Sequence, residues 1–362
     1  MIIIIINLIL ICFIRFSIGW DAIIHIGPHK TGSTQLQESL VANEKVFEKF
    51  GFFRVTREPT VSVLTHKLSP EISKFKSLSE IHLDEYNRTV DNIRRCDRNV
   101  ILSHESFDFV GLEGAQNVAS LFACYNVTIV SFYRQPMDAM RSQWCQINKL
   151  TRFPEPISET FLAKYLGIVG SDRMHMTNLV RVLDVYAQLF GRDHVRVMSF
   201  EGALRRFGSV FGALLWLLQL PPDEFTQVNP IANKSPSTLA IDTVRALGDY
   251  VQMTGRKFAT NLNKIHDEIA TLSASLPNRT LTIQTPMEVI EADKRLRDKY
   301  KPYFLEEGDE QASQFSQQLD VTLFDERKLR QSTEYFHAWT TLVQKLTKPT
   351  NLSKKMNVDV VV

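Results

Sequence analysis

Cysteine is scarce in this chain of 362 residues, which contains only four. No Cys-x-x-Cys pair and no cluster of cysteine with histidine has the spacing of a metal site. We therefore expect no metal. Three cysteines follow residue 19, which is compatible with one disulfide and one thiol, but the spacing does not identify the bonded pair. The four cysteines are Cys12, Cys96, Cys124 and Cys145.

An excess of charge of either sign is also missing. Lysine and arginine total 42 against 40 aspartate and glutamate, a net charge of +2. This balance gives no support to a nucleic-acid partner, and we expect none. The apolar fraction of 44% and the charged fraction of 23% are ordinary for a globular protein, which excludes a chain that is disordered throughout. The sequence shows no internal repeat, which excludes a solenoid.

Long apolar runs are lacking beyond the first residues. Met1–Ile14 is apolar at all but one position, yet it is shorter than the ~20 residues that span a bilayer comfortably. The small residues Ser17 and Gly19 suit cleavage before Trp20. We expect residues 1–19 to be a cleaved signal peptide. A signal anchor, which would associate the protein with a membrane, and a buried strand are the alternatives.

Five Asn-X-Ser/Thr triplets fit a glycoprotein of the secretory pathway, in the Golgi lumen or secreted. Asn126 opens a strand that we expect to be buried, and Pro236 directly follows the Asn233 triplet, so these two are the weaker acceptors. The triplets begin at Asn87, Asn126, Asn233, Asn278 and Asn351.

Short β-branched runs alternate with helical patterns along the first part of the chain. The clearest strand is Val127–Tyr133, and Asn178–Phe190 has the pattern of an amphipathic helix. Such alternation predicts an α/β fold with a parallel sheet flanked by helices. We expect this core over residues 20–235, a mostly helical C-terminal part of the same domain over 236–348, and a disordered tail over 349–362. Further strands are expected at Ala22–Ile26, Phe52–Val55, Val100–Leu102 and Val195–Phe200, and further helices at Thr34–Phe50, Ile81–Cys96, Ala115–Tyr125 and Phe211–Leu220.

The strongest local signal is the loop HIGPHKTGST at residues 25–34, which follows a strand and precedes a helix. Unpaired backbone N–H groups at a helix N-terminus suit phosphate or sulfate. Lys30 adds a mobile cation, and Ser33 and Thr34 add hydroxyl donors. The ATP-binding Walker pattern places lysine directly after the second glycine, whereas here Lys30 precedes Gly32. A Gly/Ser turn capped by Thr34 is the alternative.

A second basic element follows the strand Val127–Tyr133. It comprises Arg134, then Pro136 where a helix can begin, and Ser142 on the second turn of that helix. An arginine at the C-terminal end of a parallel strand lies near the crevice where such sheets bind nucleotides, and its planar fork fits a phosphate. An ordinary surface arginine and an N-terminal helix proline are the alternative.

The phosphate loop comes first, and the arginine, proline and serine follow about a hundred residues later. This order resembles the donor site of sulfotransferases, which share the P-loop NTPase-like fold and use 3′-phosphoadenosine 5′-phosphosulfate (PAPS). The resemblance covers about residues 22–220 and includes the pattern from Tyr186 to Glu201 of Golgi and bacterial carbohydrate sulfotransferases. It implies PAPS as co-substrate, 3′-phosphoadenosine 5′-phosphate (PAP) as product, and no metal. The residues that it implies for the 5′-phosphosulfate are Lys30, Thr31, Gly32, Ser33 and Thr34, and those for the 3′-phosphate are Arg134 and Ser142.

Sulfuryl transfer also requires a base that takes the proton of the acceptor. His104 and Glu105 follow the strand Val100–Leu102, and adjacent side chains at a strand end point in opposite directions. Cytosolic sulfotransferases use histidine near this place and many carbohydrate sulfotransferases use glutamate, so both residues are candidates, Glu105 first. Asp108 and His29 remain open. The extra lysine of cytosolic members is replaced by Leu102, which favours the Golgi-like group.

The resemblance therefore implies in-line transfer of a sulfuryl group to a hydroxyl or amine acceptor, with Lys30 stabilising the leaving group. A glycan is the first expectation for the acceptor because of the luminal setting. One alternative is a non-catalytic luminal protein that binds PAP or glycan. Another is a small-molecule kinase, but the Gly-Lys-Ser/Thr order and a strand-end aspartate for Mg²⁺ are not evident.

Overall fold

The computed structural model describes residues 19–55, 81–109, 111–149, 151–154, 156–157, 179–226, 228, 236–300 and 318–348. The expected signal peptide up to residue 18, the tail at 349–362, and the triplets at Asn233 and Asn351 lie outside these residues. Within the described ranges, every helix is too short or too polar to cross a lipid bilayer.

The chain divides into two compact units, each built from three stretches of sequence. The segment Glu288–Phe315, which we expected within the C-terminal part, belongs to the same unit as the N-terminal strands. The first unit comprises Met1–Arg134, Asp172–Ala232 and Glu288–Phe315, and the second comprises Gln135–Ser171, Asn233–Met287 and Ser316–Val362.

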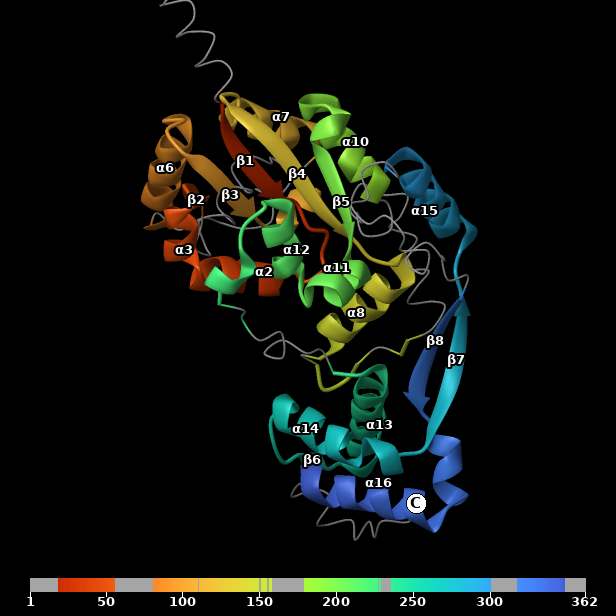
Figure 1. The fold of residues 1–362 in the computed structure, drawn as a ribbon. Helices are drawn as coiled ribbons and strands as arrows, with labels where there is room; N and C mark the ends of the chain where they lie inside the picture. The colour runs from red at the N-terminus through yellow and green to blue at the C-terminus, as the bar shows by residue number, and fades with distance from the viewer. Residues whose placement is uncertain are drawn as a thin grey trace, which may run out of the picture. The chain divides into compact units, whose positions relative to one another are not determined.

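The first unit contains a five-stranded sheet in the order β2-β3-β1-β4-β5, and all neighbouring strands are parallel (Figure 1). Because β1 is central, the loop that follows it lies between the ends of β3 and β4. The expected fold class, a parallel sheet flanked by helices, is confirmed. The strands are β1 (Trp20–His25), β2 (Phe52–Val55), β3 (Asn99–Ser103), β4 (Tyr125–Tyr133) and β5 (Val195–Ser199).

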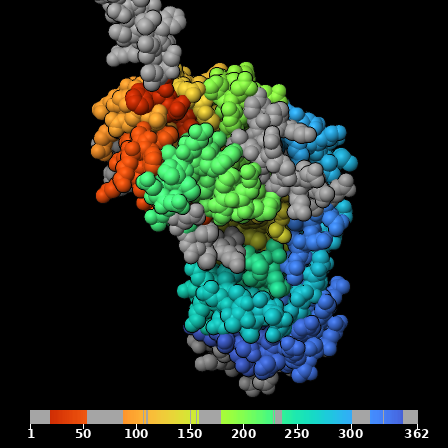
Figure 2. Space-filling model, in the orientation of Figure 1, coloured from red at the N-terminus to blue at the C-terminus, as the bar shows by residue number. Residues whose placement is uncertain are grey.

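Helices bury both faces of this sheet. Alternate residues of β1 enter different cores: Ala22 and Ile24 pack on one side and Ile23 on the other. In the space-filling view, α2, α11 and α12 cover one face (Figure 2). One face carries α6 (Ile81–Arg94), α7 (Leu112–Leu121), α10 (Leu179–Phe190) and α15 (Met287–Tyr300), and the other carries α2 (Ser33–Ala42), α3 (Glu44–Lys49), α11 (Phe200–Phe207) and α12 (Val210–Leu217).

The helix expected over Thr34–Phe50 is interrupted at Asn43, between α2 and α3. The buried amide of Asn43 donates to the carbonyls of Ser39 and Thr226, both at 2.8 Å, and accepts from the Thr226 N–H at 2.7 Å. These contacts satisfy polar groups that would otherwise be buried without partners. They explain the break, which the apolar spacing did not indicate.

The second unit is mostly helical, as expected, but it also contains an unpredicted antiparallel pair, β7 (Asn278–Gln284) with β8 (Gln318–Phe324). β7 is largely polar and exposed, and its partner lies far away in sequence, so no local hairpin pattern marks it. A two-residue pair joins β6 (Lys257–Phe258) to β9 (Thr347–Lys348). The helices are α8 (Pro136–Asn148), α13 (Thr238–Thr254), α14 (Leu262–Leu272) and α16 (Thr333–Leu346).

Short 3₁₀ helices complete the described secondary structure. The one directly after β3 is η1, and it carries residues of the expected catalytic segment. The 3₁₀ helices are η1 (Glu105–Phe109), η2 (Arg192–His194), η3 (Pro222–Glu224), η5 (Ser273–Ser275) and η7 (Glu326–Arg330).

A disulfide joins Cys96 to Cys124, with the two Cα atoms 6.3 Å apart. It links the segment before β3 to the segment before β4, so β3 and η1 lie within the covalent ring. Cys145 is buried and is not part of this disulfide. The structure thus identifies the bonded pair that the spacing left open.

The asparagine of three Asn-X-Ser/Thr triplets is exposed: Asn87 on α6, Asn126 at the start of β4, and Asn278 at the start of β7. The strand that Asn126 opens is buried along most of its length, as expected, but Asn126 itself is exposed. The outer end of β4 is only partly covered, and the Asn126 amide donates to the carboxylate of Asp21 at 2.8 Å near the surface.

Candidate functional site

Three strand ends of the first unit carry the predicted site residues. The phosphate loop follows β1, Glu105 follows β3, and Arg134 follows β4. Because these strands are parallel, their C-terminal ends lie at one edge of the sheet, where open α/β sheets bind ligands. The order of the sheet thus brings together segments that are about a hundred residues apart in sequence.

The backbone of the phosphate loop requires glycine at two positions. Gly27 has a φ of 89°, and an added Cβ would lie 3.2 Å from the Cα of Glu105. Gly32 is the N-cap of α2 with a φ of 82°, and an added Cβ would lie 3.1 Å from Val210 Cγ2. Lys30 has a φ of 69°, which is uncommon for a residue with a side chain. Such backbone tends to occur at ligand sites.

The hydroxyl groups of the loop differ in their partners. Thr31 Oγ1 donates to the carbonyl of Pro28 at 2.6 Å, which closes the loop on itself. Thr34 is exposed on the first turn of α2. Ser33 Oγ is buried and has no hydrogen-bond partner among the described residues. A buried hydroxyl without a partner is unusual, and an anion at this helix N-terminus would supply one, so the loop fits a phosphate or sulfate group.

Arg134 and Lys30 are brought together. Arg134 Nη1 donates to the backbone carbonyl of Lys30 at 2.9 Å. Its guanidinium also lies over the Phe200 ring, 4.9 Å from the centroid, with Nε 3.5 Å from Glu201 Oε1. These contacts from the start of α11 hold the arginine beside the loop. Ser142 lies on α8 in the second unit, and its part in the site stays a prediction.

Glu105 lies next to the start of the loop and is half-buried. Its Oε2 accepts a hydrogen bond from Gln37 Nε2 of α2 at 2.8 Å. Burial raises the pKa of Glu105, but His104, a backbone hydrogen bond, His29 and Gln37 together lower it below its ordinary value. The carboxylate is therefore ionised at neutral pH. Gln37 was not predicted, because its contact with Glu105 depends on the path of α2.

The other predicted base, His104, is buried, and its backbone N–H donates to the carbonyl of His25 at 3.1 Å. His25 itself is buried at the end of β1, with Nδ1 2.8 Å from Ser103 Oγ. Burial lowers the pKa of His25 to about 4, although Glu105 acts in the opposite direction. His25 is therefore neutral and belongs to the core beneath the loop.

His29 and Asp108, which the sequence left open, form a close pair. His29 Nδ1 lies 2.9 Å from Asp108 Oδ2, and the backbone N–H of His29 donates to the same oxygen at 3.1 Å. The pair joins the loop after β1 to η1 after β3. It therefore lies on the Glu105 side of the loop, while Arg134 lies on the β4 side.

A buried polar network supports the end of β4. Tyr133 OH donates to Asp293 Oδ1 at 2.5 Å and accepts from Arg297 Nη2 at 3.0 Å. Arg297 Nε also donates to Asp293 Oδ2 at 2.7 Å. Both partners come from α15, and Tyr133 directly precedes Arg134. The network thus anchors the strand end that carries the arginine. This network was not predicted, because Asp293 lies 160 residues from Tyr133 along the chain.

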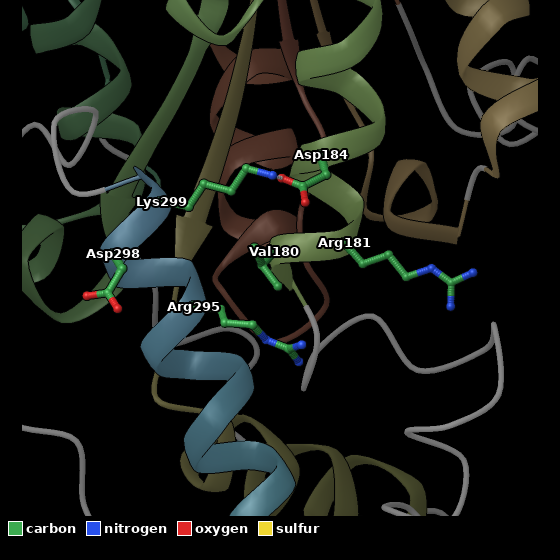
Figure 3. Close-up of a pocket in the computed structure, with 6 residues that line it drawn as sticks. All are labelled: Val180, Arg181, Asp184, Arg295, Asp298 and Lys299. Atoms are coloured by element: carbon green, nitrogen blue, oxygen red, sulfur yellow. Dashed lines mark ion pairs between the residues drawn. The ribbon is translucent and has the colours of Figure 1, made fainter.

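A separate cavity of about 600 Å³ lies between α10 and α15 of the first unit. Lys299 of α15 points toward Asp184 of α10, and the two form an ion pair at 2.7 Å (Figure 3). The cavity holds none of the predicted site residues. Its lining residues are Val180, Arg181, Asp184, Arg295, Asp298 and Lys299. Across the described residues, no group of three or more histidine, cysteine, aspartate or glutamate side chains is placed to hold a metal ion.

Comparisons with known proteins give distant structural matches. No protein-family profile matches the chain, and no curated protein matches it in sequence. Among solved structures, a sulfotransferase from Alicyclobacillus acidocaldarius is 16% identical with a TM-score of 0.38, covering 64% of this chain and 92% of that one. The sulfotransferase domain of the curacin biosynthetic pathway is 12% identical with a TM-score of 0.39, covering 77% and 97%. A chain of the PezAT toxin–antitoxin system of Streptococcus pneumoniae is 10% identical with a TM-score of 0.30, covering 68% and 87%.

Proposed function

We propose that this protein is a PAPS-dependent sulfotransferase. The observation that carries the proposal is the 2.9 Å hydrogen bond from Arg134 to the carbonyl of Lys30. It sets the two basic elements beside each other at the C-terminal edge of one parallel sheet. A nucleotide with phosphate groups at both its 3′ and 5′ positions needs two such cationic sites, and a single phosphate loop would not provide them.

In this proposal the loop binds the 5′-phosphosulfate. The N–H groups at the start of α2 and the Ser33 hydroxyl donate to its oxygens, and the Lys30 ammonium neutralises charge. The guanidinium of Arg134 binds the 3′-phosphate, and Ser142 adds a hydroxyl as the sequence predicts. No residue of this set requires a metal ion, because the lysine and arginine supply the positive charge.

The proposed reaction is a single in-line displacement at sulfur. The acceptor oxygen or nitrogen attacks, Glu105 or His104 takes its proton, and Lys30 stabilises the charge that grows on the departing phosphate oxygen. Glu105 is the first candidate for the base because its carboxylate is ionised and only half-buried, whereas His104 is buried. A glycan hydroxyl or amine is the proposed acceptor.

Replacing Arg134 tests donor binding directly. We expect Arg134→Ala to weaken PAP binding by about 10- to 100-fold, since one charge-assisted hydrogen bond contributes ~1.5–3 kcal/mol. Arg134→Lys keeps the charge but loses the planar fork, so it should restore only part of the affinity. Isothermal titration calorimetry with PAP measures both.

The control is Arg95→Ala, an exposed arginine of the same unit, which should bind PAP like the unaltered protein. The same titration with ATP and Mg²⁺ in place of PAP separates the proposal from a kinase. Tight binding of ATP with Mg²⁺, together with no binding of PAP, would refute the proposal. Transfer of ³⁵S from labelled PAPS to glycan, peptide and phenolic acceptors then separates an enzyme from a binding protein.

We also propose that the protein resides in the lumen of the secretory pathway, in the Golgi or secreted. A disulfide between Cys96 and Cys124 suits an oxidising compartment, and the exposed asparagines of three triplets are accessible to glycosylation. We expect protein from eukaryotic cells to carry glycan on Asn87 or Asn278 and to yield linked Cys96–Cys124 peptides. Peptide mass spectrometry without reductant tests both, and an unglycosylated chain with reduced cysteines would contradict the location.

A further inference from the structure

The imidazole of His29 is fixed by two contacts to one carboxylate oxygen. Asp108 Oδ2 lies 2.9 Å from His29 Nδ1 and 3.1 Å from its backbone nitrogen. Asp108 is only 1% exposed, whereas the His29 side chain is 27% exposed. A carboxylate in this position holds the proton on Nδ1 and orients the ring, so that Nε2 points away from Asp108.

The charges around this pair favour an imidazolium. Asp108 Oδ1 is buried and has no hydrogen-bond partner among the described residues, so His29 is the main source of compensation for this carboxylate. Among the described residues, Asp108 and Glu105 from η1 and Lys30 from the same loop act on the charge of His29. Burial lowers the pKa of His29 and Lys30 opposes protonation, but Asp108 and Glu105 outweigh both, so the pKa is raised.

The position of His29 in the chain links this cation to the donor. His29 lies between Pro28 and Lys30 in the loop proposed to hold the 5′-phosphosulfate. The two contacts with Asp108 tie the loop to η1, so the ring is held at a fixed place within the loop. We propose that the His29 imidazolium, oriented by Asp108, contacts the 5′-phosphate end of the donor. This inference rests on the proposed function.

In the proposed sulfuryl transfer, His29 does not lose its proton. A bond forms between the acceptor atom and sulfur, and the bond between sulfur and the bridging oxygen breaks. The electron pair of that bond stays on the 5′-phosphate oxygen of PAP, and the acceptor proton goes to the general base after β3. His29 keeps its proton and donates a hydrogen bond, which stabilises the departing phosphate together with Lys30.

PAP affinity as a function of pH tests the inference, because PAP retains the 5′-phosphate and no acceptor is needed. We expect binding to the full chain to weaken by about tenfold as pH rises through the raised pKa of His29. Deprotonation of PAP itself would strengthen binding over this range, so the two effects have opposite signs. His29→Gln should bind about tenfold more weakly at pH 6 and lose the weakening at higher pH.

Asp108→Asn tests independently whether Asp108 orients His29 and keeps it protonated. Without the carboxylate the pKa of His29 falls, so the loss of PAP affinity should occur at lower pH. A purely structural role would change affinity equally at every pH. Should Asp108→Asn fail to fold, the His29→Gln comparison decides alone. His337→Gln, an exposed histidine of α16, serves as the control and should behave like the unaltered chain.

Three outcomes bear on the inference and on the proposed function. If PAP binds and Arg134→Ala weakens it, but His29→Gln leaves the affinity unchanged at all pH values, the inference is wrong and the proposed function stands. If the pH dependence of PAP affinity is the same in the unaltered chain and in His29→Gln, His29 does not act as a cation toward the donor. If PAP does not bind at all, the proposed function fails and the inference fails with it.

Discussion

Replacing Glu105 with glutamine is expected to lower sulfuryl transfer by about 10²- to 10⁴-fold, which is the range that general bases contribute. Glutamine has the same shape and its oxygen can still accept from Gln37, so the loop is preserved. It cannot take the proton of the acceptor. PAP binding should therefore change little, and the loss should appear in kcat. Turnover with labelled PAPS and calorimetry with PAP measure the two separately.

The pH dependence of transfer adds a second check on Glu105. Its pKa is lowered by His104, a backbone hydrogen bond, His29 and Gln37, in spite of burial. A base acts in its deprotonated form, so activity should persist as pH falls through the ordinary glutamate range near 4.5 and decline only below it. This acidic decline should be absent from the residual activity of Glu105→Gln.

Glu113→Gln on α7 is the matched control, since Glu113 is exposed in the same unit. Full transfer by Glu105→Gln would exclude Glu105 as the base. His104→Asn would then be expected to abolish transfer, because His104 is the second candidate. Loss of PAP binding in Glu105→Gln would instead mean that the negative charge of Glu105 supports the loop.

The second large effect is expected at Lys30. Removing a group that stabilises developing charge costs about 10²- to 10³-fold in rate. Lys30 has a φ of 69°, a conformation that alanine tolerates poorly and asparagine tolerates better. We therefore choose Lys30→Asn, which removes the ammonium without adding backbone strain. Labelled-PAPS turnover should fall by this factor.

Lys45→Ala on α3 is the matched control for Lys30, since Lys45 is exposed in the same unit. Thermal unfolding of the three proteins should coincide within a few degrees. If Lys30→Asn folds and transfers sulfate at the normal rate, the loop does not neutralise the leaving group, and the mechanism that we propose is wrong.

The parallel sheet was predictable because its strands are buried on both faces and appear as apolar runs. β1 and β4 were found within one or two residues of their observed starts or ends. The edge of the sheet that carries Lys30, Glu105 and Arg134 followed from a topological rule, since the C-terminal ends of parallel strands share one edge. Patterns of this kind depend on local sequence or on general topology.

Contacts that depend on long-range packing were not predictable. Gln37 reaches Glu105 only because α2 passes beside η1, and Asp293 reaches Tyr133 from α15. Asn43 interrupts a helix because Thr226, about 180 residues later, supplies its partners. In each case the local sequence does not indicate the contact, because the partner of the polar side chain lies in a distant segment. The pairing of β7 with β8 was missed for the same reason.

The covalent ring closed by Cys96 and Cys124 affects how the protein responds to proteolytic cleavage. The two cysteines are 28 positions apart, and β3 and η1 lie between them. A protease that cuts once inside this ring cannot release either end of the chain, because the sulfur bridge still joins them. Glu105 and Asp108 would stay attached on both sides of the cut until a reductant opened the bridge.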